Sequence, residues 1–118
     1  MHNSMTDIKK TKTALEFLNQ DQGFELGDLY LAPRNKEIAI VGQTKCNDPD
    51  NLNKRIAIEE LEEVKTRFNY YRTIDSEFDK HFKDKKIKYC LAYAYGMGGI
   101  ELCNELNGKI TWSYEIQD

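Results

Sequence analysis

The chain lacks long apolar runs, an excess of basic residues and a secretory leader, and each absence excludes a class of protein. It has no apolar run of about 18 residues, the length that a helix needs to cross a bilayer. Its first 12 residues also lack the apolar stretch of a signal peptide, so we expect a cytosolic protein with no membrane partner. The 20 acidic and 17 basic residues give a net charge of −3, so the overall field does not favour binding to a nucleic-acid backbone.

Cysteine and histidine are scarce, with three and two residues. An odd number of widely spaced cysteines is not typical of a disulfide framework, so we predict reduced thiols. The sequence has no Cys-x-x-Cys or His-x-x-x-His pair to hold a metal ion. Asp48 and Asp50 begin a pattern similar to a calcium loop, but Leu52 replaces an oxygen ligand and Asn53 stands where the loop needs glycine. We therefore predict no metal and no cofactor, and we expect a protein that is not an enzyme.

One long apolar row dominates the middle of the chain. Its members recur every three or four residues: Ala57, Leu61, Val64, Phe68, Tyr71, Ile74, Phe78 and Phe82. This spacing predicts an amphipathic helix over residues 55–83, and the capping residues in 73–75 allow a break there. The other faces of this helix carry six acidic residues, which we expect to face solvent: Glu59, Glu60, Glu62, Glu63, Glu77 and Asp79.

Helical and strand patterns surround this segment. A first helix is expected over residues 5–19, with residues 1–4 frayed, and strands over 24–32, 37–43, 87–95, 100–105 and 109–116. The order α-β-β-α-β-β-β predicts a single two-layer α+β domain that covers residues 1–118. An antiparallel sheet of about five strands would pack on the long amphipathic helix and on the N-terminal helix.

Side-chain alternation suggests the register of two hairpins. In the first, a four-residue loop places Leu31 opposite Ile38 and keeps the apolar groups on one face. In the last, a two-residue Asn-Gly turn would pair Cys103 with Trp112, whereas a three-residue loop pairs Leu102 with Trp112. We favour the three-residue loop, because it gathers the larger apolar side chains on one face.

The acidic side of the long helix is the main candidate site. Acidic residues near a helix N-terminus are favoured by the helix dipole, so they have a structural explanation as well. As a functional surface they would attract a basic protein and accelerate its association. We therefore predict a small protein-binding module, for example a bacterial immunity protein that binds and occludes a cationic toxin or nuclease. The predicted partner-binding residues are Asp48, Asp50, Glu59, Glu60, Glu62, Glu63 and Tyr70.

Two alternatives use other residues. A small-ligand-binding protein or an enzyme would use the glycine-rich segment 96–99 with Cys46 and His81, although this segment lacks the strand-to-helix setting of a dinucleotide fingerprint. A single-stranded RNA-binding adaptor would use a tyrosine row and a nearby lysine cluster. These residues are Tyr89, Tyr93, Tyr95, Lys83, Lys85, Lys86 and Lys88. The apolar character of the tyrosine strand on both faces argues instead for a central, covered strand.

Overall fold

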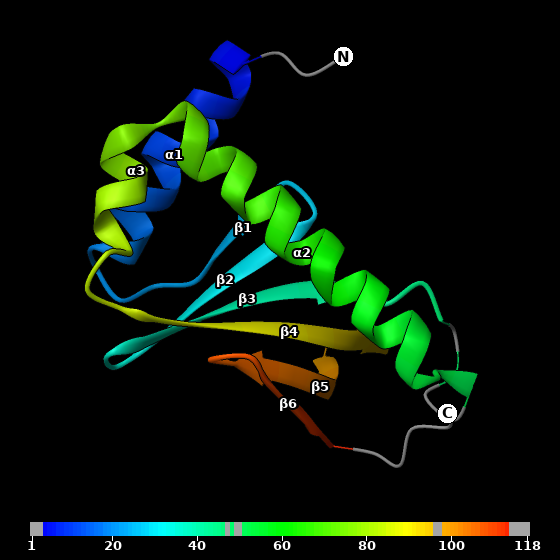
Figure 1. The fold of residues 1–118 in the computed structure, drawn as a ribbon. Helices are drawn as coiled ribbons and strands as arrows, with labels where there is room; N and C mark the ends of the chain where they lie inside the picture. Colours follow the sequence, from blue (N-terminus) through cyan, green and yellow to red (C-terminus); the bar gives the residue numbers. More distant parts are fainter. Residues whose placement is uncertain (1–3, 47, 49–50, 96–97, 114–118) are drawn as a thin grey trace.

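Three helices cover one face of a six-stranded sheet in the computed structural model, which describes residues 4–46, 48, 51–95 and 98–113 (Figure 1). This two-layer α+β arrangement confirms the predicted fold class and the predicted order of helices and strands, with one strand more than expected. The elements in chain order are α1 (Ser4–Leu18), β1 (Phe24–Leu26), β2 (Leu29–Arg34), β3 (Glu37–Gln43), α2 (Lys54–Ile74), α3 (Ser76–His81), β4 (Lys86–Tyr95), β5 (Gly98–Leu106) and β6 (Lys109–Trp112).

The strands lie in the sheet in chain order, from β1 to β6. Every neighbouring pair is antiparallel except β3 and β4, which run parallel. A parallel pair needs a long crossover connection, and α2 with α3 provides it across the face that all three helices cover. Within the described ranges, no helix or strand covers the opposite face of the sheet (Figure 1).

The additional strand arises where one strand was predicted over residues 24–32. A tight turn at Gly27 and Asp28 pairs Leu26 with Leu29 and folds this segment into β1 and β2. Gly27 has a positive φ of 61°, a conformation that glycine adopts without the steric cost of a Cβ. The expectation of one long strand was wrong because it overlooked a change of phase at this turn, where the apolar positions pass from Phe24 and Leu26 to Leu29 and Leu31.

The predicted register of the next hairpin was also wrong. Leu31 pairs with Ile40 rather than with Ile38, because the turn contains two residues instead of four. Asn35 lies in this turn with a φ of 56°, in the left-handed region that asparagine tolerates. The shift of two residues leaves Leu31, Ile38 and Ile40 buried on the same side of the sheet, as the alternation predicted.

The last hairpin follows the alternative that we had not favoured. Cys103 pairs with Trp112 around a two-residue turn, and both turn residues, Asn107 and Gly108, have positive φ. The argument for the longer loop was that Leu102 would otherwise lie on the wrong face. A register shift in β5 removes this conflict, because it interrupts the alternation next to Leu102 and allows both Leu102 and Cys103 to be buried.

The long helix begins at a side-chain cap and breaks where the sequence allowed it. Asn53 caps α2, because its side-chain oxygen accepts the backbone N–H of Ile56 at 2.9 Å. The helix ends at Ile74, and Asp75 separates it from α3. The fully buried rings of the apolar row come from both helices and pack edge to face in the core: Phe68, Phe78 and Phe82. None of the helices, as far as the chain is described, is long and apolar enough to cross a membrane.

Candidate functional site

The first turns of α2 present three exposed carboxylates, those of Glu59, Glu62 and Glu63. They lie on the side of the helix opposite the buried positions Ala57, Leu61 and Val64, because the apolar row fixes how the helix faces the sheet. Ile58 lies at the edge of this side, one turn before Glu62, and leaves 44% of its surface exposed. We call Ile58, Glu59, Glu62 and Glu63 the α2 docking face.

Glu60 does not belong to this surface, so the expectation that it faces solvent was wrong. It is only 8% exposed and lies on the buried side of α2. Its carboxylate accepts the hydroxyl of Thr44 at 2.7 Å and the backbone N–H of Lys45 at 2.9 Å. A buried carboxylate needs such partners, and these two attach the loop after β3 to the helix. The role that the contacts support for Glu60 is therefore structural.

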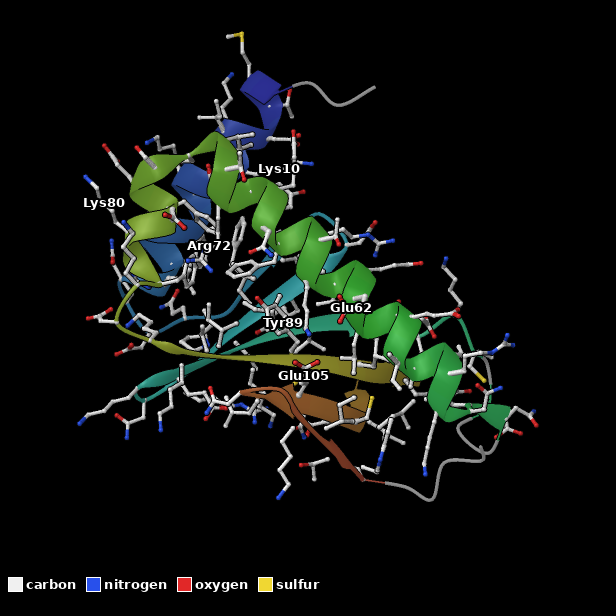
Figure 2. The ribbon with its side chains drawn as sticks, viewed as in Figure 1. Lys10, Glu62, Arg72, Lys80, Tyr89 and Glu105 are labelled. Carbon is white, nitrogen blue, oxygen red and sulfur yellow. The ribbon has the colours of Figure 1, made fainter. Side chains whose placement is uncertain are left out.

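Basic side chains lie next to two of the three exposed carboxylates. Glu63 is 3.4 Å from Arg67 and 3.9 Å from Lys45. Glu62 is 3.2 Å from Lys65, but Lys65 is closer to Glu105 of β5, at 2.8 Å. In Figure 2, Glu62 lies on α2 above Glu105, in agreement with Lys65 bridging the helix and the sheet. No ion pair involves Glu59 within the described residues, so the docking face is only partly neutralised.

The other predicted partner-binding residues lie elsewhere or serve other contacts. Tyr70 is about 16 Å further along α2 than Glu59, from the helical rise of 11 residues. Its hydroxyl donates a 2.6 Å hydrogen bond to Asp7 of α1, and this contact together with burial raises the pKa of Tyr70 to about 12. Asp48 is exposed in the loop before α2, where its side chain accepts a hydrogen bond from Asn51. Asp50 lies outside the described residues.

The residues of the first alternative are not brought together. Cys46 follows the end of β3, whereas His81 ends α3 near the start of that strand (Figure 1). The length of β3 separates them by about 20 Å, from the rise of a strand. The Cys46 thiol donates to the backbone oxygen of Asp48. Gly96 and Met97 of the glycine-rich segment lie outside the described residues.

The tyrosines of the second alternative do not form an exposed row. Tyr89 and Tyr93 pack against the core on the helix side of the sheet, and the side chain of Tyr95 lies outside the described residues. Figure 2 shows Tyr89 between α2 and β4. The stacking platform that RNA binding would need is therefore not presented by the two tyrosines that the structure describes.

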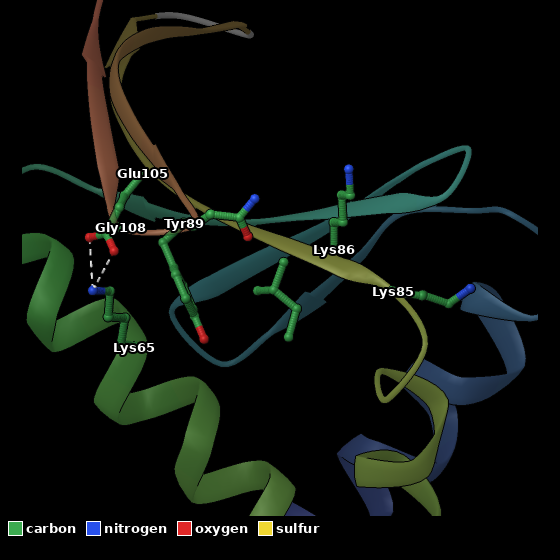
Figure 3. Close-up of a pocket in the computed structure, with 8 residues that line it drawn as sticks. Lys65, Lys85, Lys86, Tyr89, Glu105 and Gly108 are labelled. Carbon is green, nitrogen blue, oxygen red and sulfur yellow. Dashed lines mark hydrogen bonds and ion pairs between the residues drawn. The ribbon is translucent and has the colours of Figure 1, made fainter.

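An open depression of about 410 Å³ lies between α2, β4 and the β5–β6 turn (Figure 3). Its walls include the Lys65–Glu105 ion pair, Tyr89, Lys85 and Lys86. The two lysines point away from the Tyr89 ring, and Lys65 is already held by carboxylates (Figure 3). Because these polar groups do not converge on one point, the depression does not form a catalytic constellation. Across the described residues, no group of three or more metal-ligating side chains occurs either.

Sequence reasoning found the three exposed carboxylates but missed Ile58. The signal was present, because Ile58 is an apolar residue outside the apolar row of its own helix. The Lys65–Glu105 contact joins residues 40 positions apart, and no local pattern indicates it. No protein-family model, curated protein or solved structure matches this chain.

Proposed function

We propose that this chain is a protein-binding module that docks a basic partner protein on the α2 docking face. The observation that carries this proposal is the exposed Ile58 side chain, which lies one turn before the exposed Glu62 on the same helix that exposes Glu59 and Glu63. An apolar anchor within a charged rim is the usual arrangement of a small protein interface. The concrete form that we propose is an immunity-type protein, which occludes a cationic toxin or nuclease by covering its basic cleft.

The carboxylates remain available to a partner in spite of their basic neighbours. The side chains of Glu62 and Glu63 are 64% and 47% exposed, and exposed ion pairs contribute only about 0–1 kcal/mol. The arginines of a partner can therefore replace Arg67 and Lys45 at little cost. Lys65 keeps Glu105 as its partner when Glu62 turns to another cation, so this exchange leaves no buried charge unpaired.

The roles within the interface follow from these environments. Glu59 and Glu62 attract and orient the basic surface, which mainly increases the association rate. Ile58 loses its exposed surface on binding, which mainly slows dissociation. Glu60 contributes indirectly, because it holds Thr44 and Lys45 and thereby places the Lys45 side chain beside Glu63.

The experiment compares affinity capture by the wild-type chain, by Glu59→Lys/Glu62→Lys and by Glu16→Lys. Glu16 is an exposed carboxylate on α1, so its reversal is a matched control away from the docking face. We expect wild type and Glu16→Lys to capture the same basic protein from a lysate of the source organism, and the double variant to lose it.

Association rates measured with the captured protein then test the electrostatic argument. At low salt the double variant should associate at least about tenfold more slowly, and the difference should shrink as ionic strength rises. Equal capture by all three proteins, or association rates that do not depend on salt, would contradict the docking face.

A further inference from the structure

β6 is one edge of the sheet, and the backbone groups on its outer side pair with no other strand of the described residues. The N–H of Ser113 donates to the carbonyl of Leu102 at 2.8 Å, so Ser113 points its backbone groups inward to β5. Backbone direction alternates along an antiparallel strand, so Lys109 and Thr111 also point inward. The N–H and C=O groups of Ile110 and Trp112 therefore point outward, where no other strand of the described chain pairs with them.

We propose that β6 pairs with β6 of a second copy of this chain, in antiparallel orientation about a twofold axis at Thr111. In this register Ile110 of each copy lies opposite Trp112 of the other, and Thr111 lies opposite itself. The outward backbone groups of Ile110 and Trp112 then exchange hydrogen bonds, and the two sheets become one continuous sheet. This interaction does not use the α2 docking face, because that face belongs to the helix layer and β6 belongs to the edge of the sheet.

The side chains of β6 suit this self-pairing. Ile110 and Trp112 are partly buried on the helix side of the sheet, where each would contact the other residue type across the new strand pair. Pairs of aromatic and β-branched residues, and pairs of threonines, are among the favourable cross-strand neighbours. Lys109 is the only charged residue of β6, and it lies opposite Ser113 of the second copy rather than opposite another lysine.

No helix or strand of the described residues lies beyond β6 at this edge of the sheet, so a second copy can approach it there. In Figure 1, α2 passes above β4 and β5, and β6 extends beyond it at the edge of the sheet. The strand is only four residues long and contains no proline. With two hydrogen-bonded residue pairs the contact contributes about four hydrogen bonds, so we expect a reversible dimer that forms at high protein concentration.

Cysteine cross-linking tests the register directly. In a Cys46→Ser background, Thr111→Cys places two thiols on the twofold axis. There the Cα atoms of a pair without hydrogen bonds are about 4.5 Å apart, which suits a disulfide. The matched control is Lys109→Cys, because its two copies would lie about 14 Å apart along the strands, from the strand rise, and cannot be bridged.

Oxidised glutathione should convert the Thr111→Cys protein to a disulfide-linked dimer and leave the Lys109→Cys protein monomeric. Equal cross-linking of both variants, or none of either, would overturn the proposed register.

Sedimentation equilibrium tests the association without a covalent link. Thr111→Lys brings two ammonium groups together at the axis and should raise the dimer Kd by about fivefold or more. The same substitution at the exposed Thr13 of α1 should leave the dimer Kd unchanged. A wild-type chain that stays monomeric at millimolar concentration, or an equal effect of both lysines, would refute self-pairing through β6.

Discussion

Thr11 of α1 donates a 2.7 Å hydrogen bond to the carboxylate of Asp75, the residue that separates α2 from α3. Thr11 is fully buried and Asp75 is 5% exposed. The same carboxylate accepts the backbone N–H groups of Glu77 and Phe78 and so caps α3. One side chain therefore begins α3 and holds α1 against the junction of the other two helices.

Replacement of Asp75 with alanine should destabilise the domain by about 2–4 kcal/mol. This value combines a lost helix cap, about 1 kcal/mol, with the lost hydrogen bond between Thr11 and a charged carboxylate, about 1–3 kcal/mol. The Thr11 hydroxyl keeps the Ile8 carbonyl as an acceptor at 2.7 Å, so it is not left unsatisfied. Urea unfolding followed by circular dichroism measures the change. Asp84→Ala is the control, because Asp84 is exposed beyond α3 and its removal should cost less than about 0.5 kcal/mol. Equal losses would show that the Asp75 contacts contribute little.

The same carboxylate should make stability depend on acidity. Burial alone would raise the pKa of Asp75, but hydrogen bonds from Thr11 and Phe78 and the charge of Lys12 lower it below the ordinary value of 3.8. A carboxyl whose folded-state pKa lies below its unfolded-state pKa contributes stability above the unfolded value and loses it as the pH falls through the folded value. The free energy of unfolding should therefore decrease from about pH 4 downward, and less steeply in Asp75→Asn. Identical pH profiles from urea titrations would contradict this assignment.

The sequence predicted the kinds of element well and the strand registers poorly. The apolar row indicated the long helix, and the capping residues in 73–75 indicated the break at Asp75. Strand register depended on contacts far apart in the chain. The three-residue loop that we favoured would have placed Glu105 opposite Lys109. In the structure Glu105 lies opposite Ile110 and binds Lys65 of α2, a contact that is compatible with the shorter turn. Helix periodicity is local, whereas register is settled by the whole core.

The candidate site shows the same limit. Glu59, Glu62 and Glu63 could be located from helical spacing alone, because each lies away from the apolar row. Glu60 lies at the edge of that row. A charged residue at such a position is predicted to be exposed unless its hydrogen-bond partners are known. Those partners, Thr44 and the Lys45 amide, come from a loop that has no regular pattern.

Removal of the Glu60 carboxylate should release this loop. In Glu60→Ala, the Thr44 hydroxyl and the Lys45 amide lose their acceptor, so the domain should lose about 1–3 kcal/mol of stability. The Cys46 amide, which donates to the Thr44 hydroxyl oxygen at 3.2 Å, should exchange its hydrogen faster, and the Cys46 thiol should be alkylated faster. Glu59→Ala, one position away on the exposed face, should change neither rate. Unchanged exchange at Lys45 and Cys46 in Glu60→Ala would exclude the anchoring role.

Gly42 of β3 and Val64 of α2 should show a strong coupling, because they determine how closely the helix approaches the sheet. A Cβ added at Gly42 would overlap the Cγ2 atom of Val64, and both residues are buried. Gly42→Ala should therefore cost about 1–3 kcal/mol through overpacking. In the double variant Gly42→Ala/Val64→Ala the new methyl group fills the space left by valine, so the combined loss should be smaller than the sum of the single losses by about 1 kcal/mol or more.

Gly99→Ala is the control, because its added Cβ would be 3.5 Å from Ala92, an ordinary contact, and its effect should stay below about 1 kcal/mol. Urea unfolding of these four variants decides the question, and additive losses at Gly42 and Val64 would mean that the helix is not held at contact distance by this pair.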